Sequence, residues 1–232
     1  MKIQYSDLKY IAYQRTDYLI FRRNLLLRIA TCIFPKKIKT ELRIGFECFF
    51  RKKAIMEAYE KDMQDEYDEI KNFLPVKVNN ILDIGCGLGG IDVFLNLHYN
   101  AQKPRFYCQD KTKTDTVFYG FNKTAAFYNS LENTKQFLQL NGIQNINILE
   151  ADSTYKISTD EKFDLIISLI AWGYHFPVDT YLDEVYLHLN NNGHLIMDIR
   201  KNTNGIEILE QKFSKIIHIK ETEKKIRVMA VK

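Results

Sequence analysis

Residues 80–95, NILDIGCGLGGIDVFL, decide the fold of this 232-residue chain. Ile81, Leu82 and Ile84 indicate the end of a buried parallel strand, and an apolar helix is expected from about Ile91. A glycine-rich loop lies between them. Glycine is required there because the turn must reach φ values that other residues resist, and because a ligand must approach bare backbone. The stretch therefore predicts the nucleotide-binding corner of a doubly wound α/β sheet.

The glycine spacing alone leaves the ligand open, because Gly85, Gly87 and Gly90 also fit the dinucleotide pattern G-x-G-x-x-G. Asp83, two positions before the first glycine, favours a different ligand. A carboxylate at this strand end repels a pyrophosphate but attracts an ammonium group. S-adenosylmethionine carries an α-amino group and a sulfonium and has no phosphate. A nicotinamide or flavin site and a purely structural turn are the alternatives.

The sequence Asp83-Ile84-Gly85-Cys86-Gly87 resembles motif I, D-x-G-x-G, of the class I S-adenosylmethionine-dependent methyltransferases. The resemblance covers roughly residues 76–232. It implies an α/β fold: a Rossmann-like, doubly wound, seven-stranded sheet that ends in a C-terminal antiparallel hairpin. It also implies S-adenosyl-L-methionine as the cofactor and S-adenosyl-L-homocysteine as the product. The residues that it places at the cofactor are Asp83, Gly85, Cys86, Gly87 and Gly89.

The remainder of this region alternates strands and helices in the expected rhythm. Beyond the first strand, we expect strands at 105–108, 146–150, 163–170 and 194–199, and a hairpin from 215–220 and 225–231. Helices are expected from about 91, over about 125–141, from 177–179 to about 189, and near 205–212. Gly142 should end the second of these as a C-cap glycine, and 190–193 should be a turn.

Polar residues follow the second and third strands. In a doubly wound sheet the second strand ends beside the ribose, where an acidic side chain accepts from hydroxyl groups. Asp110 is the expected acceptor, with Gln109 as the alternate and a surface Asp at a turn as the structural alternative. Asp152-Ser153 resembles the third motif of the family. That resemblance implies that Asp152 accepts from the adenine amino group while the adjacent backbone N–H meets a ring nitrogen; a capping or turn aspartate is the alternative.

The fourth strand delivers residues 168–177, SLIAWGYHFP, to the same edge of the sheet. In the family this position lines the methyl-transfer site, which places Ser168 at the cofactor and Trp172 and Tyr174 at the substrate. His175 is the expected general base because neutral imidazole titrates near working pH. A structural His175 and a Trp172 that fills the core are the alternatives. The Asn/Asp-Pro-Pro-Tyr sequence of enzymes that methylate DNA bases or glutamine is absent here, which argues against those substrates.

Residues 111–124 form a long connection between the second strand and the next helix. A loop of this length is uncommon unless it serves binding. Its aromatic residues, within 117–121, either close over the ligand or anchor the loop.

Residues 1–75 are expected to form a helical N-terminal cap, separate in character from a methyltransferase domain at 76–232. Helices are expected at 40–53 and 54–73, and an amphipathic helix is indicated by the apolar stripe Tyr10, Tyr13, Tyr18, Phe21, Leu25 and Ile29. The segment is interpreted as a lid packed on the sheet domain, a substrate-gripping cap, or a peripheral membrane contact. The last would be built on the basic residues Arg22, Arg23, Arg28, Lys36 and Lys37.

Composition narrows the class of protein. No apolar run reaches the length of a membrane span, and the N-terminus lacks the pattern of a signal peptide. Cys32, Cys48, Cys86 and Cys108 are scattered without metal-ligand spacing, so a cytoplasmic protein with reduced thiols and no bound metal is expected. The net charge of +4 is uneven, because residues 1–60 hold thirteen Lys or Arg against six Asp or Glu.

Taken together, the resemblance implies methyl transfer to an oxygen, in preference to a nitrogen, of a small molecule or a glycan. The glycine loop looks similar to that of sugar O-methyltransferases. One alternative is an RNA or protein methyltransferase whose basic N-terminal helices dock the polymer. Another is a protein that binds the cofactor structurally or for a reaction other than methyl transfer.

Overall fold

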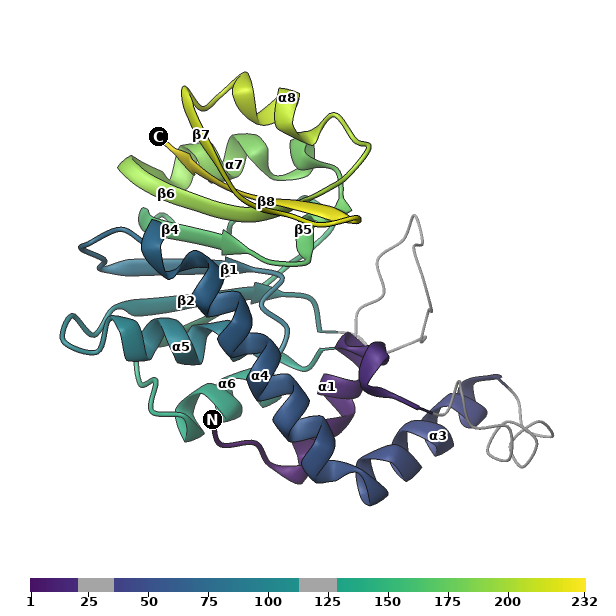
Figure 1. Ribbon diagram of the computed structural model, residues 1–232. Coiled ribbons are helices and arrows are strands. Elements are labelled where there is room, and N and C mark those ends of the chain that lie inside the picture. The colour runs from purple at the N-terminus through teal and green to yellow at the C-terminus, as the bar shows by residue number, and fades with distance from the viewer. Residues whose placement is uncertain (21–35, 113–128) are drawn as a thin grey trace.

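The computed structural model describes residues 1–20, 36–112 and 129–232. Seven strands form one sheet in the order β3-β2-β1-β4-β6-β8-β7 (Figure 1). The strands are β1 (Asn80–Ile84), β2 (Arg105–Asp110), β3 (Ile146–Glu150), β4 (Phe163–Ser168), β6 (Leu189–Arg200), β7 (Lys215–Glu221) and β8 (Lys225–Val231). A further short strand, β5 (Ala171–Phe176), lies outside that order.

The pairing of the strands confirms the predicted doubly wound sheet and its closing hairpin. β1 pairs in parallel with β2 and β4, while β8 runs antiparallel to both β6 and β7. The chain moves outward from β1 through β2 to β3 and then returns to the other side of β1 as β4. The strand order therefore reverses between β1 and β4, and ligands of such sheets bind at the carboxyl ends of the strands beside this reversal.

The described helices are α1 (Leu8–Gln14), α3 (Lys36–Phe50), α4 (Lys52–Ile70), α5 (Gly90–His98), α6 (Leu131–Leu140), α7 (Leu182–His188) and α8 (Gly205–Glu210). Single 3₁₀ turns lie at η1 (Tyr5–Asp7), η2 (Thr16–Tyr18), η3 (Lys71–Phe73) and η4 (Val178–Thr180). None of these described helices has the length and apolar character needed to cross a membrane.

The alternation of side chains along β1 divides the core into two layers, because successive residues of a strand point to opposite faces. Ile81 belongs to the layer covered by α1, α4, α5 and α6, whereas Leu82 belongs to the layer covered by α7 and α8 (Figure 1). The first layer also contains Ile11 of α1 and Ile55 of α4, both fully buried. The described parts of residues 1–75 thus share a core with the sheet.

Several boundaries differ from the expected ones. The predicted turn at 190–193 lies within β6, as an irregularity of register that shifts the partner of β4 from Leu189 to His194. Backbone hydrogen bonds join Asn192 and Gly193 to Lys232, so these residues continue strand β6 instead of forming a turn. β5 replaces an expected loop, and β4 ends at Ser168 rather than at 170.

The helix expected at about 125–141 begins later, at Leu131, because Ser130 is in an extended conformation and its hydroxyl accepts from the N–H of Asn133. Gly142 does end it: the φ of Gly142 is +90°, and the N–H of Ile143 donates to Leu138 O. In the N-terminal segment, α3 begins at Lys36 and the break before α4 lies at Arg51.

Some predictions fall on residues that the structure does not describe. They are most of the long loop at 111–124, Cys32, the stripe residues Phe21, Leu25 and Ile29, and the basic residues Arg22, Arg23 and Arg28. The side chains of Lys36 and Lys37 are likewise outside the described part of the chain. Cys48, Cys86 and Cys108 are free and buried.

Candidate functional site

The glycine loop between β1 and α5 has the backbone geometry that the sequence predicts. Gly85, Gly87 and Gly89 have φ values of +75°, +56° and +82°, which disfavour any residue with a Cβ. Gly85 is also crowded, because a Cβ on it would lie 2.4 Å from Cβ of Ala171 at the start of β5. The N–H of Gly85 donates to Gln109 O at 2.7 Å. The ends of β1 and β2 and the start of β5 therefore meet at this loop.

Asp83 forms a buried carboxyl pair with Asp92, a residue of α5 that the sequence interpretation missed. Their exposed fractions are 3% and 0%. Burial, then the charge of Asp92, raises the pKa of Asp83 well above its usual value. Burial also raises the pKa of Asp92 to about 7, against hydrogen bonds with Cys108 and Asp83 that lower it. Two carboxyl groups with raised pKa values beneath a bare backbone loop form a site that favours positive charge.

Asp110, at the end of β2, ties the glycine loop to that strand. Its Oδ2 accepts from the N–H of Gly87 at 2.8 Å and from Nδ2 of Asn129 at 3.1 Å. Its Oδ1 accepts from the N–H of Lys111 at 2.7 Å. Burial raises the pKa of Asp110, and these three hydrogen bonds oppose the rise. A carboxylate offers about four lone-pair sites, so roughly one acceptor position is left for a ligand.

Asp152 lies at the neighbouring strand end, in an exposed turn after β3. The N–H of Ala151 donates to Asp110 O at 2.8 Å, which brings the two strand ends together. Asp152 Oδ1 accepts from the N–H and from the hydroxyl of Thr154, at 2.7 and 2.5 Å, and these bonds lower the pKa of Asp152. Its contacts are those of a turn aspartate, and Ser153 beside it is exposed.

Ser168 and Trp172 hold the turn between β4 and β5. Ser168 Oγ donates to Ile84 O at 2.8 Å and accepts from the N–H of Trp172 at 3.0 Å. Trp172 is only 1% exposed, and its indole N–H donates to Val178 O at 2.9 Å. The indole therefore fills the core layer beneath α7. This is the position expected of a core residue rather than of one that contacts the substrate.

Tyr174 and His175 lie farther along β5, beside Arg200 of β6. The guanidinium of Arg200 stands 4.4 Å from the ring centre of Tyr174, and its Nε donates to Tyr174 O. Partial burial and the positive charge of Arg200 lower the pKa of His175. Since a strand rises about 3.3 Å per residue, His175 lies roughly 13 Å along β5 from Ala171, the residue that contacts the glycine loop.

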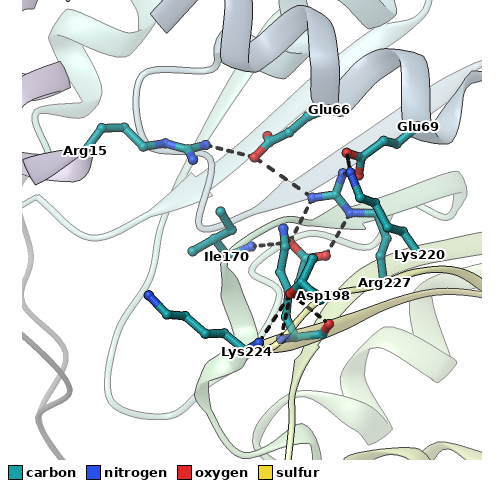
Figure 2. A network of polar contacts seen from close by, with 10 residues as sticks. Arg15, Glu66, Glu69, Ile170, Asp198, Lys220, Lys224 and Arg227 are labelled. Carbon is teal, nitrogen blue, oxygen red and sulfur yellow. Dashed lines mark hydrogen bonds and ion pairs between the residues drawn. The ribbon is translucent and has the colours of Figure 1, made fainter. Parts of the chain in front are cut away.

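A buried ionic network stands behind the β4–β5 turn (Figure 2). Asp198 of β6 is fully buried and accepts from Nε and from an Nη of Arg227 at 2.8 and 2.9 Å. Its Oδ2 also accepts from the N–H of Ile170 at 3.1 Å. Ile170 has a φ of +54°, which is strained for a β-branched residue. Asp198 thus holds a strained turn one residue before the contact of Ala171 with Gly85.

The same network reaches the N-terminal helices. Arg227 donates to Glu69 of α4 at 2.9 Å and lies 3.9 Å from Glu66. Glu66 in turn accepts from Arg15, the residue that follows α1, at 3.1 Å. The network therefore links residues 15, 66, 198 and 227, which are far apart in the sequence.

Several residues that meet the glycine loop carry unpartnered polar atoms. Four buried side-chain atoms among the described residues have no hydrogen-bond partner, and three of them are Gln14 Nε2, Asp92 Oδ1 and Gln109 Oε1. Gln14, at the end of α1, lies against the loop: a Cβ on Gly87 would be 2.8 Å from its Oε1. A buried donor and buried acceptors left unpaired are costly unless a ligand satisfies them. The site thus fits a ligand that has donors, acceptors and a positive charge.

Within the described residues, no three His, Cys, Asp or Glu side chains gather as the ligands of a metal ion would.

Comparison with known proteins finds similar folds among solved structures but no related sequence. No protein-family model and no curated protein matches this chain. Among solved structures, a methyltransferase from Pyrococcus furiosus is similar with a TM-score of 0.51 and 15% identity, over 73% of this chain and 82% of that one. Residues 942–1257 of StiE, named as an O-methyltransferase, are similar with a TM-score of 0.51 and 15% identity, over 72% of each chain. The chain therefore has the fold of the class I methyltransferases, as the resemblance of motif I implies.

Proposed function

We propose that this chain is an S-adenosylmethionine-dependent methyltransferase. The observation that carries the proposal is the buried pair Asp83 and Asp92 beneath a glycine loop in the left-handed conformation. A pyrophosphate at this loop would lie beside two carboxyl groups, so a dinucleotide is disfavoured. A cationic adenosine compound satisfies both the charge and the need for close backbone approach. The fold shared with known methyltransferases supports the same choice.

In this proposal the cofactor, when bound, supplies a methyl group on a positively charged sulfur. Asp83 holds the ammonium group, and the glycine loop lets the backbone approach. Asp110 accepts from a ribose hydroxyl with its remaining lone pair, with Gln109 and its unpartnered Oε1 beside it. Asp152 and the N–H of Ser153 pair with the adenine edge. The chain's main contribution is to align the reacting atoms, since the sulfonium is already a good leaving group.

We propose an oxygen of a small molecule or glycan as the methyl acceptor. The lowered pKa of His175 keeps its imidazole neutral at pH 7, as a base for a hydroxyl proton requires. Its distance along β5 from the glycine loop means that His175 would act on an acceptor lying over β5, beside Tyr174. The name of one structural neighbour, an O-methyltransferase, supports oxygen.

Calorimetry with the purified chain tests the cofactor. We expect S-adenosylmethionine to bind and Asp83→Asn to weaken its affinity by about tenfold or more, because the ammonium loses its counter-charge in a buried site. Asp183→Asn, on an exposed α7 carboxylate that pairs with Lys212, is the matched control and should leave affinity unchanged. Binding of NADH in place of S-adenosylmethionine would contradict the proposal.

Turnover separates methyl transfer from structural use of the cofactor. With a pool of glycans and metabolites and a radiolabelled methyl donor, the chain should release S-adenosyl-L-homocysteine and label an acceptor. Tight binding of the donor without turnover on any acceptor would favour a non-methyl role.

A further inference from the structure

Helix α3 is apolar on two sides, although only one side is covered. Ile44 and Cys48 point inward and are 2% and 4% exposed, where α3 contacts α1. The outer side carries four large apolar side chains with exposed fractions of 43 to 65%: Leu42, Phe46, Phe49 and Phe50. We call these four residues the elbow patch, because they lead into the bend between α3 and α4 (Figure 1). A helix that is apolar on both sides is normally covered on both.

The elbow patch is one surface rather than four isolated side chains. Its positions follow the i, i+4, i+7, i+8 spacing of a single helix face. The ring centres of Phe46 and Phe50 are 4.4 Å apart, and those of Phe49 and Phe50 are 4.9 Å apart. Contiguous exposed apolar surface of this kind marks interaction sites.

The charge around the patch is positive. Residues 41–53, whose side chains the structure describes, hold four Lys or Arg against two Glu, a net charge of +2. One of the two acidic residues, Glu47, is 1% exposed and paired with Arg51, so it presents little negative charge to solvent. Lys52 and Lys53, which follow Phe50 after Arg51, are exposed. The partner of this surface must therefore be both apolar and negatively charged.

We propose that the elbow patch docks on the surface of an anionic lipid bilayer. Phenylalanine and leucine side chains flanked by Lys and Arg are the composition of interfacial helices, which bury their apolar face at the boundary of headgroups and acyl chains. A second copy of the chain is disfavoured, because pairing the same patch across a two-fold axis brings two positively charged surfaces together. A nucleic acid satisfies the charge but leaves Leu42 and the phenyl edges without an apolar partner. The proposal does not depend on methyl transfer.

Vesicle co-sedimentation tests the proposal with the full chain. We expect binding to phosphatidylcholine vesicles that contain about a third phosphatidylserine, and at least about tenfold weaker binding to pure phosphatidylcholine. Binding should weaken as salt rises from about 0.05 to about 0.5 M. Phe49→Glu/Phe50→Glu should lower binding by about tenfold or more. Leu97→Glu, at a 64% exposed position of α5, is the matched control and should bind as the unaltered chain does.

A second measurement does not rely on the folding of the double variant. Trp172 is the only tryptophan and is buried, so Phe49→Trp adds a reporter at a position that is 65% exposed. Its emission should shift to shorter wavelength on addition of anionic vesicles and should be quenched by brominated lipid. Absence of vesicle binding, or equal binding of the double variant, would overturn the proposal. So would a salt-resistant dimer dissolved by Phe49→Glu, or binding of RNA without binding of vesicles.

Discussion

At the glycine loop, two buried carboxyl groups make the site sensitive to pH before any ligand is present. Because burial raises the pKa of Asp92 from 3.8 to about 7, protonation of Asp92 stabilises the folded chain. This stabilisation is fully present below the pKa that Asp92 has in the unfolded chain. That effect is lost as the pH rises through about 7. The raised pKa of Asp83 acts in the same direction. A bound cation would reverse this, since a positive charge lowers the pKa of both groups.

Asp92→Asn tests this directly. At pH 8 the substitution removes a buried charge, so we expect the free energy of unfolding to rise by about 2–4 kcal/mol. The gain should shrink as the pH falls below about 7, where Asp92 of the original chain is already protonated. Urea denaturation at several pH values measures it, with Asp183→Asn as the exposed control. A gain that does not vary with pH would contradict the assigned pKa.

Among the elements, β6, β8 and α4 are joined by charged groups rather than by apolar packing alone. Arg227 is 1% exposed and contacts Asp198 of β6 and Glu69 of α4. Burial by itself would raise the pKa of Asp198, but Arg227 and Lys225 hold the pKa of that carboxyl below its usual value. This matters for the site because Asp198 also accepts from the N–H of the strained residue Ile170.

Arg227→Met should destabilise the fold by about 3–5 kcal/mol, because it leaves Asp198 with a poorly compensated buried charge. The double variant Asp198→Asn/Arg227→Met should recover a large part of the loss. Chemical denaturation of both variants gives the values. Lys201→Met, which breaks a surface pair with Glu221, is the control and should change stability by less than about 1 kcal/mol. If Arg227→Met were as stable as the original chain, the ionic network would contribute little to stability.

For the whole molecule, the N-terminal helices and the sheet are expected to unfold together. Ile11 of α1 and Ile55 of α4 lie in the same core layer as Ile81 of β1. Lys2 also exchanges hydrogen bonds with Asn141, which follows α6. A segment held in this way has no separate core to unfold around.

Ile11→Ala should therefore lower the free energy of unfolding by about 2–4 kcal/mol. The change should be seen equally by far-ultraviolet circular dichroism and by the fluorescence of Trp172, which lies on the other side of the sheet. Val76→Ala, at an 87% exposed position, is the control. An unchanged Trp172 transition beside a shifted dichroism signal would mean that residues 1–75 unfold independently.

Features of neighbouring residues in the sequence made the strand, glycine loop and helix of residues 80–95 predictable. The apolar strand, the glycines and the following helix lie within residues 80–95, and Gly142 ends a helix by a conformation that depends on its own φ. The parallel sheet and its closing hairpin follow from the order of short apolar runs, because their periodicity is also a property of neighbouring residues. The strand ends that carry Asp110 and Asp152 could be placed for the same reason.

The other features of the site depend on which segments, distant in the sequence, come into contact in the fold. Nothing near Gln14 or Arg227 in the sequence indicates that they lie at the glycine loop or behind the β4–β5 turn. Asp92 gave a weak signal, as a carboxylate in an apolar helix, but its pairing with Asp83 required the folded core. Trp172 points into the core because β5 packs against β6 there. Periodicity and turn chemistry act between neighbours along the chain, whereas burial and charge pairing arise only when the chain brings remote elements into contact.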